Sequence, residues 1–393
     1  MSYSYNLRSL PLNETSPEKK TDQTTKFIHA SDIHLGSHQY EKSFRSDDYI
    51  YALKEILQIS LNFSVDFILL GGDIFNSLDI LPGKMAVIIE ILKEFQKATK
   101  GKIPIIAIEG NHDIRRFSRG VRFNHRNQSW LKVCAKLGLI ILLNADLQAP
   151  SDKIFQPYDF EQVKGGKIQI KNVVIYGSRY LGEKPTSALS IIRKGINKES
   201  GIYNILLQHF GVEGQMKNVP GVPLEILNPL HHRVDYLALG HFHKQFVLDD
   251  WIYNPGSAEA VSSIDFTYNR SIFFVEISGV ETFKKKVQIL KLNNRACLRK
   301  FIANPYQFKK KENFYRYIIR MLKVAPEFTG ITKITSCLKS PFLILSIRGV
   351  KPLLYCDIKQ REIEKLLVQN LPIIGAKVYQ KYDSRMITLE NYF

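Results

Sequence analysis

The sequence predicts an α/β fold built on a parallel β-sheet, followed by a smaller α+β unit. Short apolar runs rich in β-branched residues alternate with stretches whose apolar residues recur every three or four positions, which is the pattern of strand–helix–strand units. Five of the apolar runs end in a short polar segment containing Asp, Asn or His. These side chains therefore belong at the carboxyl ends of neighbouring strands, where an α/β sheet forms its crevice.

The first half of the chain is expected to alternate three strands with two helices. Strands are predicted over residues 26–30, 65–70 and 103–108, each stopped by a polar or glycine-containing segment. Between them, the apolar residues of 47–63 and 83–100 recur at helical spacing. This order of elements indicates right-handed crossovers and a parallel sheet.

The middle of the chain contains fewer helices. Short apolar strands are predicted over residues 173–176, 204–208, 236–239, 251–253 and 271–277. An Asn-Pro-Gly-Ser turn at 254–257 follows the fourth of these strands. Two sheets packed face to face, with helices outside, accommodate this order.

The composition changes after about residue 290. Between residues 281 and 323 there are thirteen Lys or Arg residues and two acidic residues. Asn-Pro at 304–305 indicates a boundary. The expected domains are a disordered extension over 1–25, a main domain over 26–290, and a basic junction with an α+β unit over 291–393. The last of these is predicted to contain a strand over 342–347, a helix over 361–371 and a strand over 376–382.

Overall composition restricts the class of protein. The 393 residues are 45% hydrophobic and carry a formal net charge of +18, which favours a polyanionic partner such as nucleic acid or an anionic membrane surface. A basic surface without a partner is the alternative. Four cysteines without a C-x-x-C pair fit a reducing compartment. No uncharged run approaches the roughly 20 residues of a membrane-spanning helix, and residues 1–25 lack the apolar centre of a signal peptide. A cytoplasmic protein is expected, with no membrane partner.

Two pairs of polar residues have the spacing of metal ligands. Asp32 and His34 are two positions apart, and His241 and His243 share that spacing. On an extended strand, residues i and i+2 face the same side, so each pair can hold one ion. Alone, either tripeptide is weak evidence, because most such sequences are polar surface.

Three further residues complete the ligand set. Asp73 follows a glycine at a strand end, and its two carboxylate oxygens can bridge two metals. Asn111 offers an amide oxygen and His209 another imidazole. Together with the two pairs, they make seven donors, enough for two divalent ions with open positions for water and substrate. His112, next to Asn111, is placed for phosphate chemistry, and Asp113 is expected to orient its imidazole.

The motifs D-x-H, G-D, G-N-H-D, H and G-H-x-H, in this order over residues 26–278, resemble those of the calcineurin-like metallophosphoesterase superfamily. The resemblance implies a four-layer αββα sandwich with a binuclear centre, most often of Mn²⁺. It assigns one ion to Asp32, His34, Asp73 and His243, the other to Asp73, Asn111, His209 and His241, and the catalytic role to His112.

Within that superfamily, the segments 28–36, 66–75 and 105–113 and the turn at 254–257 are similar to the SbcD-type subunit of the double-strand-break repair nuclease. This implies a metal-dependent DNA exonuclease and endonuclease that hydrolyses phosphodiesters, with a C-terminal α+β capping domain. The implied partners are DNA, a coiled-coil ABC ATPase of the SbcC type and a second copy of the chain, with a nucleoid location in a prokaryote. One departure is Asn76, which stands where these nucleases usually carry a second histidine; an amide cannot transfer a proton at neutral pH, which puts exonuclease efficiency in doubt.

A basic loop follows the predicted catalytic histidine. It contains Arg115, Arg116, Arg119, Arg122 and Arg126 and no acidic residue among them. Beside a site that cuts phosphodiesters, such a loop is a natural track for a DNA backbone; the alternative is a solvated basic helix. Two other functions stay open: a phosphatase or phosphodiesterase acting on a small or lipid substrate, and a DNA-end-binding scaffold with reduced exonuclease activity.

Overall fold

The structure is a computed structural model that describes residues 24–114, 128–182, 185–303, 305–308, 310–329, 340–350 and 358–382. The chain divides into two compact units, Met1–Asn293 and Asn294–Phe393. Within the described ranges, every helix is too short or too polar to span a lipid bilayer.

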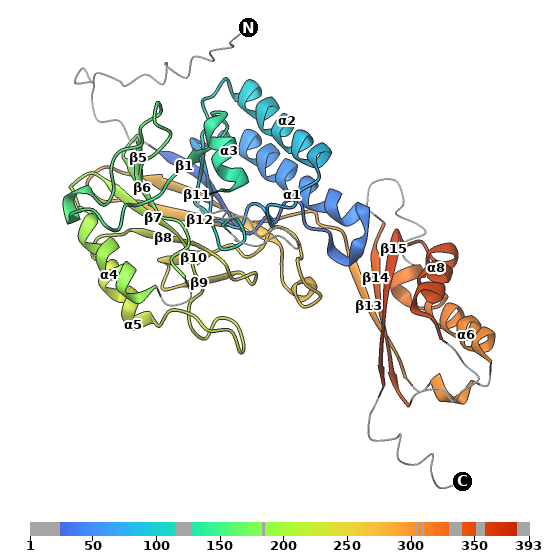
Figure 1. The fold of residues 1–393 in the computed structure, drawn as a ribbon. Helices are drawn as coiled ribbons and strands as arrows, with labels where there is room; N and C mark the ends of the chain where they lie inside the picture. The colour runs from blue at the N-terminus through green and yellow to red at the C-terminus, as the bar shows by residue number, and fades with distance from the viewer. Residues whose placement is uncertain are drawn as a thin grey trace. The chain divides into compact units, whose positions relative to one another are not determined.

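A six-stranded sheet in the order β12-β11-β1-β2-β3-β4 forms half of the first unit (Figure 1). Its strands are β1 (Thr25–Ala30), β2 (Phe67–Leu70), β3 (Ile105–Ala107), β4 (Ile141–Leu142), β11 (Ser271–Ser278) and β12 (Lys284–Lys291). β1 to β4 run parallel, whereas β11 and β12 join antiparallel at one edge. The helices of this half are α1 (Ser43–Asn62), α2 (Pro82–Thr99) and α3 (Trp130–Lys136). They pack on one face of the sheet, because Ile56 of α1 and Ile88 of α2 share a core with Ile28 and Ile68 of the strands.

A second six-stranded sheet has the order β5-β6-β7-β8-β10-β9. Its strands are β5 (Lys167–Ile170), β6 (Val173–Gly177), β7 (Tyr203–His209), β8 (Tyr236–Gly240), β9 (Phe246–Leu248) and β10 (Ile252–Asn254). The four central strands are parallel and the two edge strands are antiparallel. α4 (Thr186–Gly195) and α5 (Leu224–Leu227) cover its outer face, where Leu189 and Leu227 pack with Leu206 and Leu237 of the strands.

Aromatic and aliphatic side chains together fill the space between the two sheets. The Phe27 ring stacks on Phe67 at a centroid distance of 5.0 Å and meets Tyr236 of the other sheet edge-on at 5.4 Å. Strand alternation divides the side chains of β1 between two cores, since Phe27 faces the second sheet while its neighbour Ile28 faces the helices. The four layers, helices, sheet, sheet and helices, confirm the predicted αββα sandwich.

The second unit is a small α+β body. Its parallel sheet has the order β13-β14-β15, with the elements β13 (Cys297–Ala303), α6 (Lys311–Lys323), α7 (Pro326–Thr329), β14 (Phe342–Gly349), α8 (Gln360–Asn370) and β15 (Gly375–Tyr382). Phe314 and Ile318 of α6 and Leu367 of α8 pack against Leu343 and Leu345 of the central strand. One face of the sheet is therefore covered by helices.

The basic segment between residues 281 and 323 is more regular than the sequence indicated, because it contains β12, β13 and α6. In β12, Lys284, Lys286 and Gln288 are exposed while Lys285 and Val287 are partly buried. Lysines on an edge strand discourage pairing with another chain, and their number conceals the alternation that marks a strand. The described 3₁₀ helices are η1 (Gln39–Glu41), η2 (Ser151–Lys153), η3 (Asn228–Leu230), η4 (Asp265–Thr267) and η5 (Pro305–Gln307).

Candidate metal centre

The loop after β1 carries the first two predicted ligands. Asp32 and His34 have left-handed backbones with φ of 51° and 53°, so the prediction that they share a face of an extended strand is wrong. Their N–H groups donate instead to the carbonyls of Gly72 and Asp73, each at 3.0 Å. This pairing between the loops after β1 and β2 directs the side chains of Asp32 and His34 into one buried site at the ends of these strands. Left-handed non-glycine residues of this kind cluster at functional sites.

Asp73 lies in the loop after β2, where the surrounding backbone approaches it closely. A Cβ on Gly110 would lie 2.4 Å from the Asp73 backbone nitrogen, so no side chain fits at that position. The close approach lets the N–H of His112 donate to Asp73 Oδ1 at 2.7 Å. The loop after β3 is thereby fixed against the loop after β2, with Asp73 between them.

Three histidines reach the same place from the second sheet. His209 ends β7, and His241 and His243 follow β8. His209 Nδ1 donates to the Gly71 carbonyl at 2.7 Å, and the His241 N–H donates to the Asp32 carboxylate at 3.0 Å. Both contacts cross between the sheets, so the site forms only when the two sheets pack.

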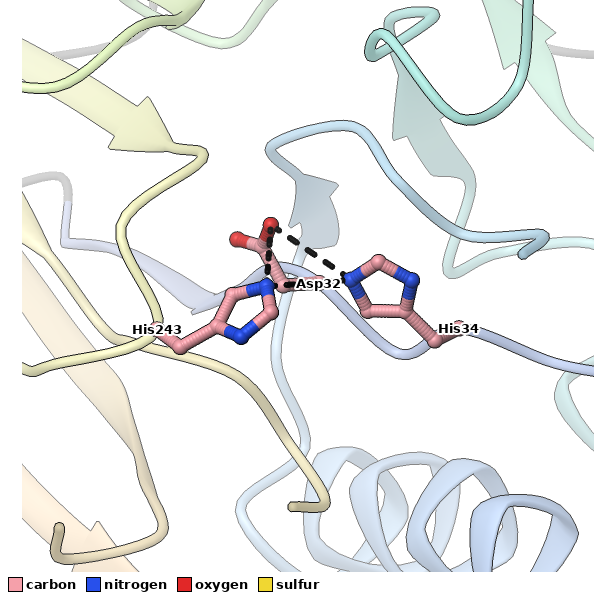
Figure 2. Close-up of side chains that lie close together, drawn as sticks. All are labelled: Asp32, His34 and His243. Atoms are coloured by element: carbon pink, nitrogen blue, oxygen red, sulfur yellow. Dashed lines mark hydrogen bonds and ion pairs between the residues drawn. The ribbon is translucent and has the colours of Figure 1, made fainter. Parts of the chain in front are cut away.

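Asp32, His34 and His243 form the first cluster (Figure 2). The Nε2 atoms of His34 and His243 are 3.2 Å apart, and Asp32 Oδ1 lies 4.0 and 3.9 Å from them. A point equidistant from these three atoms lies about 2.2 Å from each, a normal length for a metal bond to imidazole or carboxylate. In the neutral rings, Nδ1 of each histidine donates to another acceptor, Asn76 Oδ1 or Asp265 Oδ2. Two lone pairs then face each other across a gap that suits a cation.

Asp73, His209 and His241 form the second cluster. Asp73 Oδ2 lies 3.3 Å from His209 Nε2, and Asn111 Oδ1 lies 3.1 Å from His209 Nε2 and 3.0 Å from His241 Nδ1. Asp73 Oδ2 is also 3.9 Å from His34 Nε2, so this carboxylate faces both clusters. The structure therefore brings all seven predicted ligand side chains together, in two adjacent groups with Asp73 facing both.

Burial and neighbouring charge set the protonation of these side chains. Burial lowers the pKa of His34 and of His241 to about 3, so both rings are neutral at pH 7 and offer a lone pair. Burial has the same effect on His209, but the adjacent Asp73 carboxylate outweighs it and raises the pKa of His209 to about 9. Burial opposes the ionisation of Asp73, yet His209 holds the pKa of that carboxyl below its usual range. An ionised, buried carboxylate near the neutral imidazoles of His34 and His241 suits a divalent cation, and the proton on His209 must leave when an ion binds there.

Comparison with known families agrees with this geometry. Residues 25–245, more than half of the chain, match the family described as calcineurin-like phosphoesterase. The chain belongs to this family. Its fold implies a dinuclear divalent metal site, and the two adjacent clusters supply nitrogen and oxygen donors for it.

Several relatives of this phosphoesterase are described as "DNA double-strand break repair protein Mre11". The protein of that name from Archaeoglobus fulgidus is 28% identical over 242 residues, covering 60% of this chain and 50% of the relative. The one from Saccharolobus solfataricus is 26% identical over 265 residues, covering 67% and 59%. The chain thus spans about half the length of the curated relatives it matches. Among solved structures, a dimetal phosphatase from Danio rerio aligns with a TM-score of 0.39 and 8% identity, over 68% of this chain and 98% of its own.

In this phosphoesterase, Asn76 holds two histidines. His112 Nδ1 donates to the main-chain carbonyl of Asn76 at 3.0 Å, and His34 Nδ1 donates to its side-chain oxygen at 3.3 Å. The His112 ring lies 4.7 Å from the His34 ring, measured between centroids, and one ring nitrogen of His112 is within 4.8 Å of the ligand atoms of His34 and Asp73. The bond to Asn76 leaves Nε2 of His112 as the nitrogen that can exchange a proton with a substrate.

Asp113 has a different role from the one predicted. Its carboxylate accepts hydrogen bonds from the backbone N–H groups of Ile74, Phe75 and Gly110, at 3.3, 2.8 and 2.9 Å. The His112 imidazole is held by Asn76 instead. Asp113 therefore fixes the loops after β2 and β3 to each other and does not orient the imidazole directly.

Two residues beside the clusters were not identified from the sequence. Asp265, at the start of η4, accepts a hydrogen bond from His243 Nδ1 at 2.9 Å and is 2% exposed. The Tyr180 ring lies 6.0 and 5.9 Å from the rings of His209 and His241. Neither residue belongs to a motif, and only the folding of their loops brings them to the site.

The predicted DNA-contacting arginines, Arg115, Arg116, Arg119, Arg122 and Arg126, lie outside the described residues. Trp130, just beyond that loop, donates its indole N–H to the Leu78 carbonyl at 3.1 Å and packs against the first core. Trp130 is thus a structural residue of this unit.

Proposed function

We propose that this chain is a metal-dependent DNA nuclease of double-strand-break repair, acting as an exonuclease or an endonuclease. The observation that carries the proposal is the pair of adjacent donor clusters, with the Asp73 carboxylate of the second cluster 3.9 Å from His34 of the first. Two adjacent ions are what an in-line displacement at a phosphodiester uses. The names of the relatives support DNA as the substrate.

The side chains of the site have separate tasks in this proposal. When bound, two divalent ions supply a water of lowered pKa and neutralise the charge that builds on the phosphate. Asp73 faces both clusters, while neutral His34 and His241 present lone pairs in fixed directions. His112, held through Nδ1 by Asn76, gives a proton from Nε2 to the leaving oxygen. Manganese is the proposed ion from the resemblance to the metallophosphoesterase family, and donors of carboxylate, amide and imidazole type without a thiolate are compatible with it.

The deciding experiment compares substrates in the presence of manganese. The full chain is incubated with labelled duplex, single-stranded and hairpin DNA, with and without a chelator. We expect cleavage of duplex ends or hairpins that needs manganese and stops with the chelator. Hydrolysis of an aryl phosphodiester without cleavage of DNA would instead indicate a phosphodiesterase for a small or lipid substrate.

Asn76 favours one second candidate, a DNA-end-binding scaffold with reduced exonuclease activity. Its side-chain amide accepts a hydrogen bond from His34 but cannot transfer a proton, whereas SbcD-type nucleases usually carry a histidine there. DNA binding without cleavage in the same experiment would support this candidate.

The proposed partners follow from the same relatives. We propose a coiled-coil ABC ATPase of the SbcC type, a second copy of this chain, and a capping role on DNA for residues 294–393. Light scattering of the purified chain, alone and with such an ATPase, tests the two protein partners. A monomer that does not bind the ATPase would overturn both.

DNA affinity is expected to fall steeply with salt if the basic loop binds phosphates. Each lost phosphate contact reduces the slope of log K against log[salt] by about 0.9. Replacing Arg115, Arg116, Arg119, Arg122 and Arg126 by Gln is therefore expected to reduce the slope for duplex DNA, measured by fluorescence anisotropy. Lys93→Gln with Lys97→Gln, on the exposed face of α2, is the control. An unchanged slope in the arginine variant would exclude the loop as the DNA track.

Asp265→Asn is expected to weaken the binding of one metal ion by about 10–100-fold. The Asp265 carboxylate accepts the Nδ1 proton of His243 and is itself held by the N–H groups of Val261 and Ser262 at 3.0 and 2.9 Å. Its charge makes Nε2 of His243 more basic, and the amide removes that charge while keeping the size. Calorimetric titration with Mn²⁺ measures the effect. The exposed Asp152→Asn is the control, and two sites of unaltered affinity in Asp265→Asn would contradict the assignment.

A further inference from the structure

The three-stranded sheet of the second unit has a face that none of its described helices covers. The parallel register aligns residues of β13, β14 and β15 in rows across this face. Three of these rows are Arg299–Ile344–Lys377, Phe301–Ser346–Tyr379 and Ala303–Arg348–Lys381, in which Ile344 and Ser346 of the central strand are buried. These nine positions, called the outer sheet face, hold four cations, two aromatic residues and no acid.

Strand alternation shows that these side chains point away from the helices. The residues between the rows, including Leu343, Leu345 and Val378, lie in the core formed with α6 and α8, so their neighbours along each strand face the other way. Phe301 is 58% exposed, an unusual value for a phenylalanine in the middle of a strand. The exposed cations of this face are Arg299, Arg348 and Lys381.

The aromatic row is arranged for stacking. The Arg348 guanidinium lies 4.5 Å from the centroid of the Phe301 ring, so a planar cation extends the aromatic surface. Ser346 lies between Phe301 and Tyr379 in the register, and its small side chain does not project between the two rings. Phe301 and Tyr379 are two strands apart, which separates them by about 10 Å at the usual strand spacing. Each ring can therefore take a different base.

The combination of aromatic faces and cations identifies the ligand chemistry. Bases of a single strand expose their faces and stack on aromatic side chains and on guanidinium planes, while nearby cations hold the phosphates. The base faces of a duplex are stacked on each other, so a duplex would gain only the attraction between its phosphates and these cations. Lys377 contributes less to the positive potential of this face, because its Nζ forms an ion pair with the Glu364 carboxylate at 3.8 Å.

We propose that the outer sheet face binds single-stranded nucleic acid, with bases stacked on Phe301 and Tyr379 and phosphates held by Arg299, Arg348 and Lys381. This surface uses none of the residues of the metal centre. It gives the chain a second nucleic-acid site, distinct in chemistry from the site that acts on phosphodiesters.

The test measures binding of a fluorescent 20-nucleotide oligothymidine by the full chain, with a duplex of equal length for comparison. Phosphorothioate linkages keep the probes from being consumed. Phe301→Ala with Tyr379→Ala is expected to weaken oligothymidine binding at least about tenfold and to leave duplex binding unchanged. Arg348→Gln with Lys381→Gln is expected to reduce the salt slope for oligothymidine by about 1.4.

Two further variants guard against misfolding and non-specific charge effects. Phe301→Trp with Tyr379→Phe keeps both rings and is expected to bind as the wild type does. Arg316→Gln with Arg320→Gln removes two exposed charges from α6 and is expected to change little. The proposal fails if the alanine variant binds oligothymidine normally, or if the ring-retaining variant or the α6 variant loses as much affinity as the alanine variant. If the outer sheet face does not bind oligothymidine, the nuclease proposal is unaffected. If the chain does not cleave DNA, the proposal of a binding site on the outer sheet face is unaffected.

Discussion

Asp73→Asn is expected to reduce manganese-dependent DNA cleavage by about 10³-fold or more, because it removes several kcal/mol of metal-mediated stabilisation. Asp73 faces both clusters, with Oδ2 at 3.3 Å from His209 Nε2 and at 3.9 Å from His34 Nε2. The amide keeps the size of the side chain and can still accept the N–H of His112 through its oxygen. The variant therefore tests the charge of this group and leaves its shape intact.

Metal content distinguishes a shared ligand from a merely structural carboxylate. We expect the bound manganese per chain, measured by inductively coupled plasma mass spectrometry, to fall from two to one or fewer in Asp73→Asn. The exposed Asp79→Asn, six residues further along the same loop, is the control and should keep both ions. Two retained ions in Asp73→Asn would contradict the shared-ligand assignment even if cleavage were lost.

His112→Ser is expected to reduce cleavage by about 10²–10⁴-fold, the usual contribution of a general acid. Its Nδ1 is committed to the Asn76 carbonyl at 3.0 Å, so Nε2 is the atom that would reach the leaving oxygen. Because serine cannot supply a proton at neutral pH, the loss should be smaller for a substrate whose leaving group needs no protonation. Comparing a DNA phosphodiester with a p-nitrophenyl phosphodiester measures that difference.

The alternative role for His112 is that of a metal ligand, since one of its nitrogens lies within 4.8 Å of the ligand atoms of His34 and Asp73. A proton donor leaves metal content and DNA affinity unchanged when it is removed. Removal of a metal ligand lowers the metal content and reduces the cleavage of both substrates equally. Unchanged cleavage by His112→Ser would remove this residue from the mechanism altogether.

Much of the first unit could be predicted from local sequence. The β-α-β-α-β order of the first half followed from apolar spacing, which reports directly on the faces that strands and helices bury. The basic segment over 281–323 was harder to predict, because four lysines in β12 conceal the alternation of that strand. Strand ends were also displaced, since β3 covers only Ile105–Ala107, where the expected strand covered 103–108.

The identity and order of the seven predicted donors came from the sequence alone, because the polar residues that end apolar strands are visible in the chain itself. How the donors are held was decided by the tertiary structure. The left-handed backbones of Asp32 and His34 depend on pairing with the loop after β2. The contacts of Asn76 and Asp265 with histidines join residues 42, 36 and 22 positions apart. Such contacts arise only when loops that are far apart in the sequence meet in the folded chain, and no local pattern of side chains encodes that meeting.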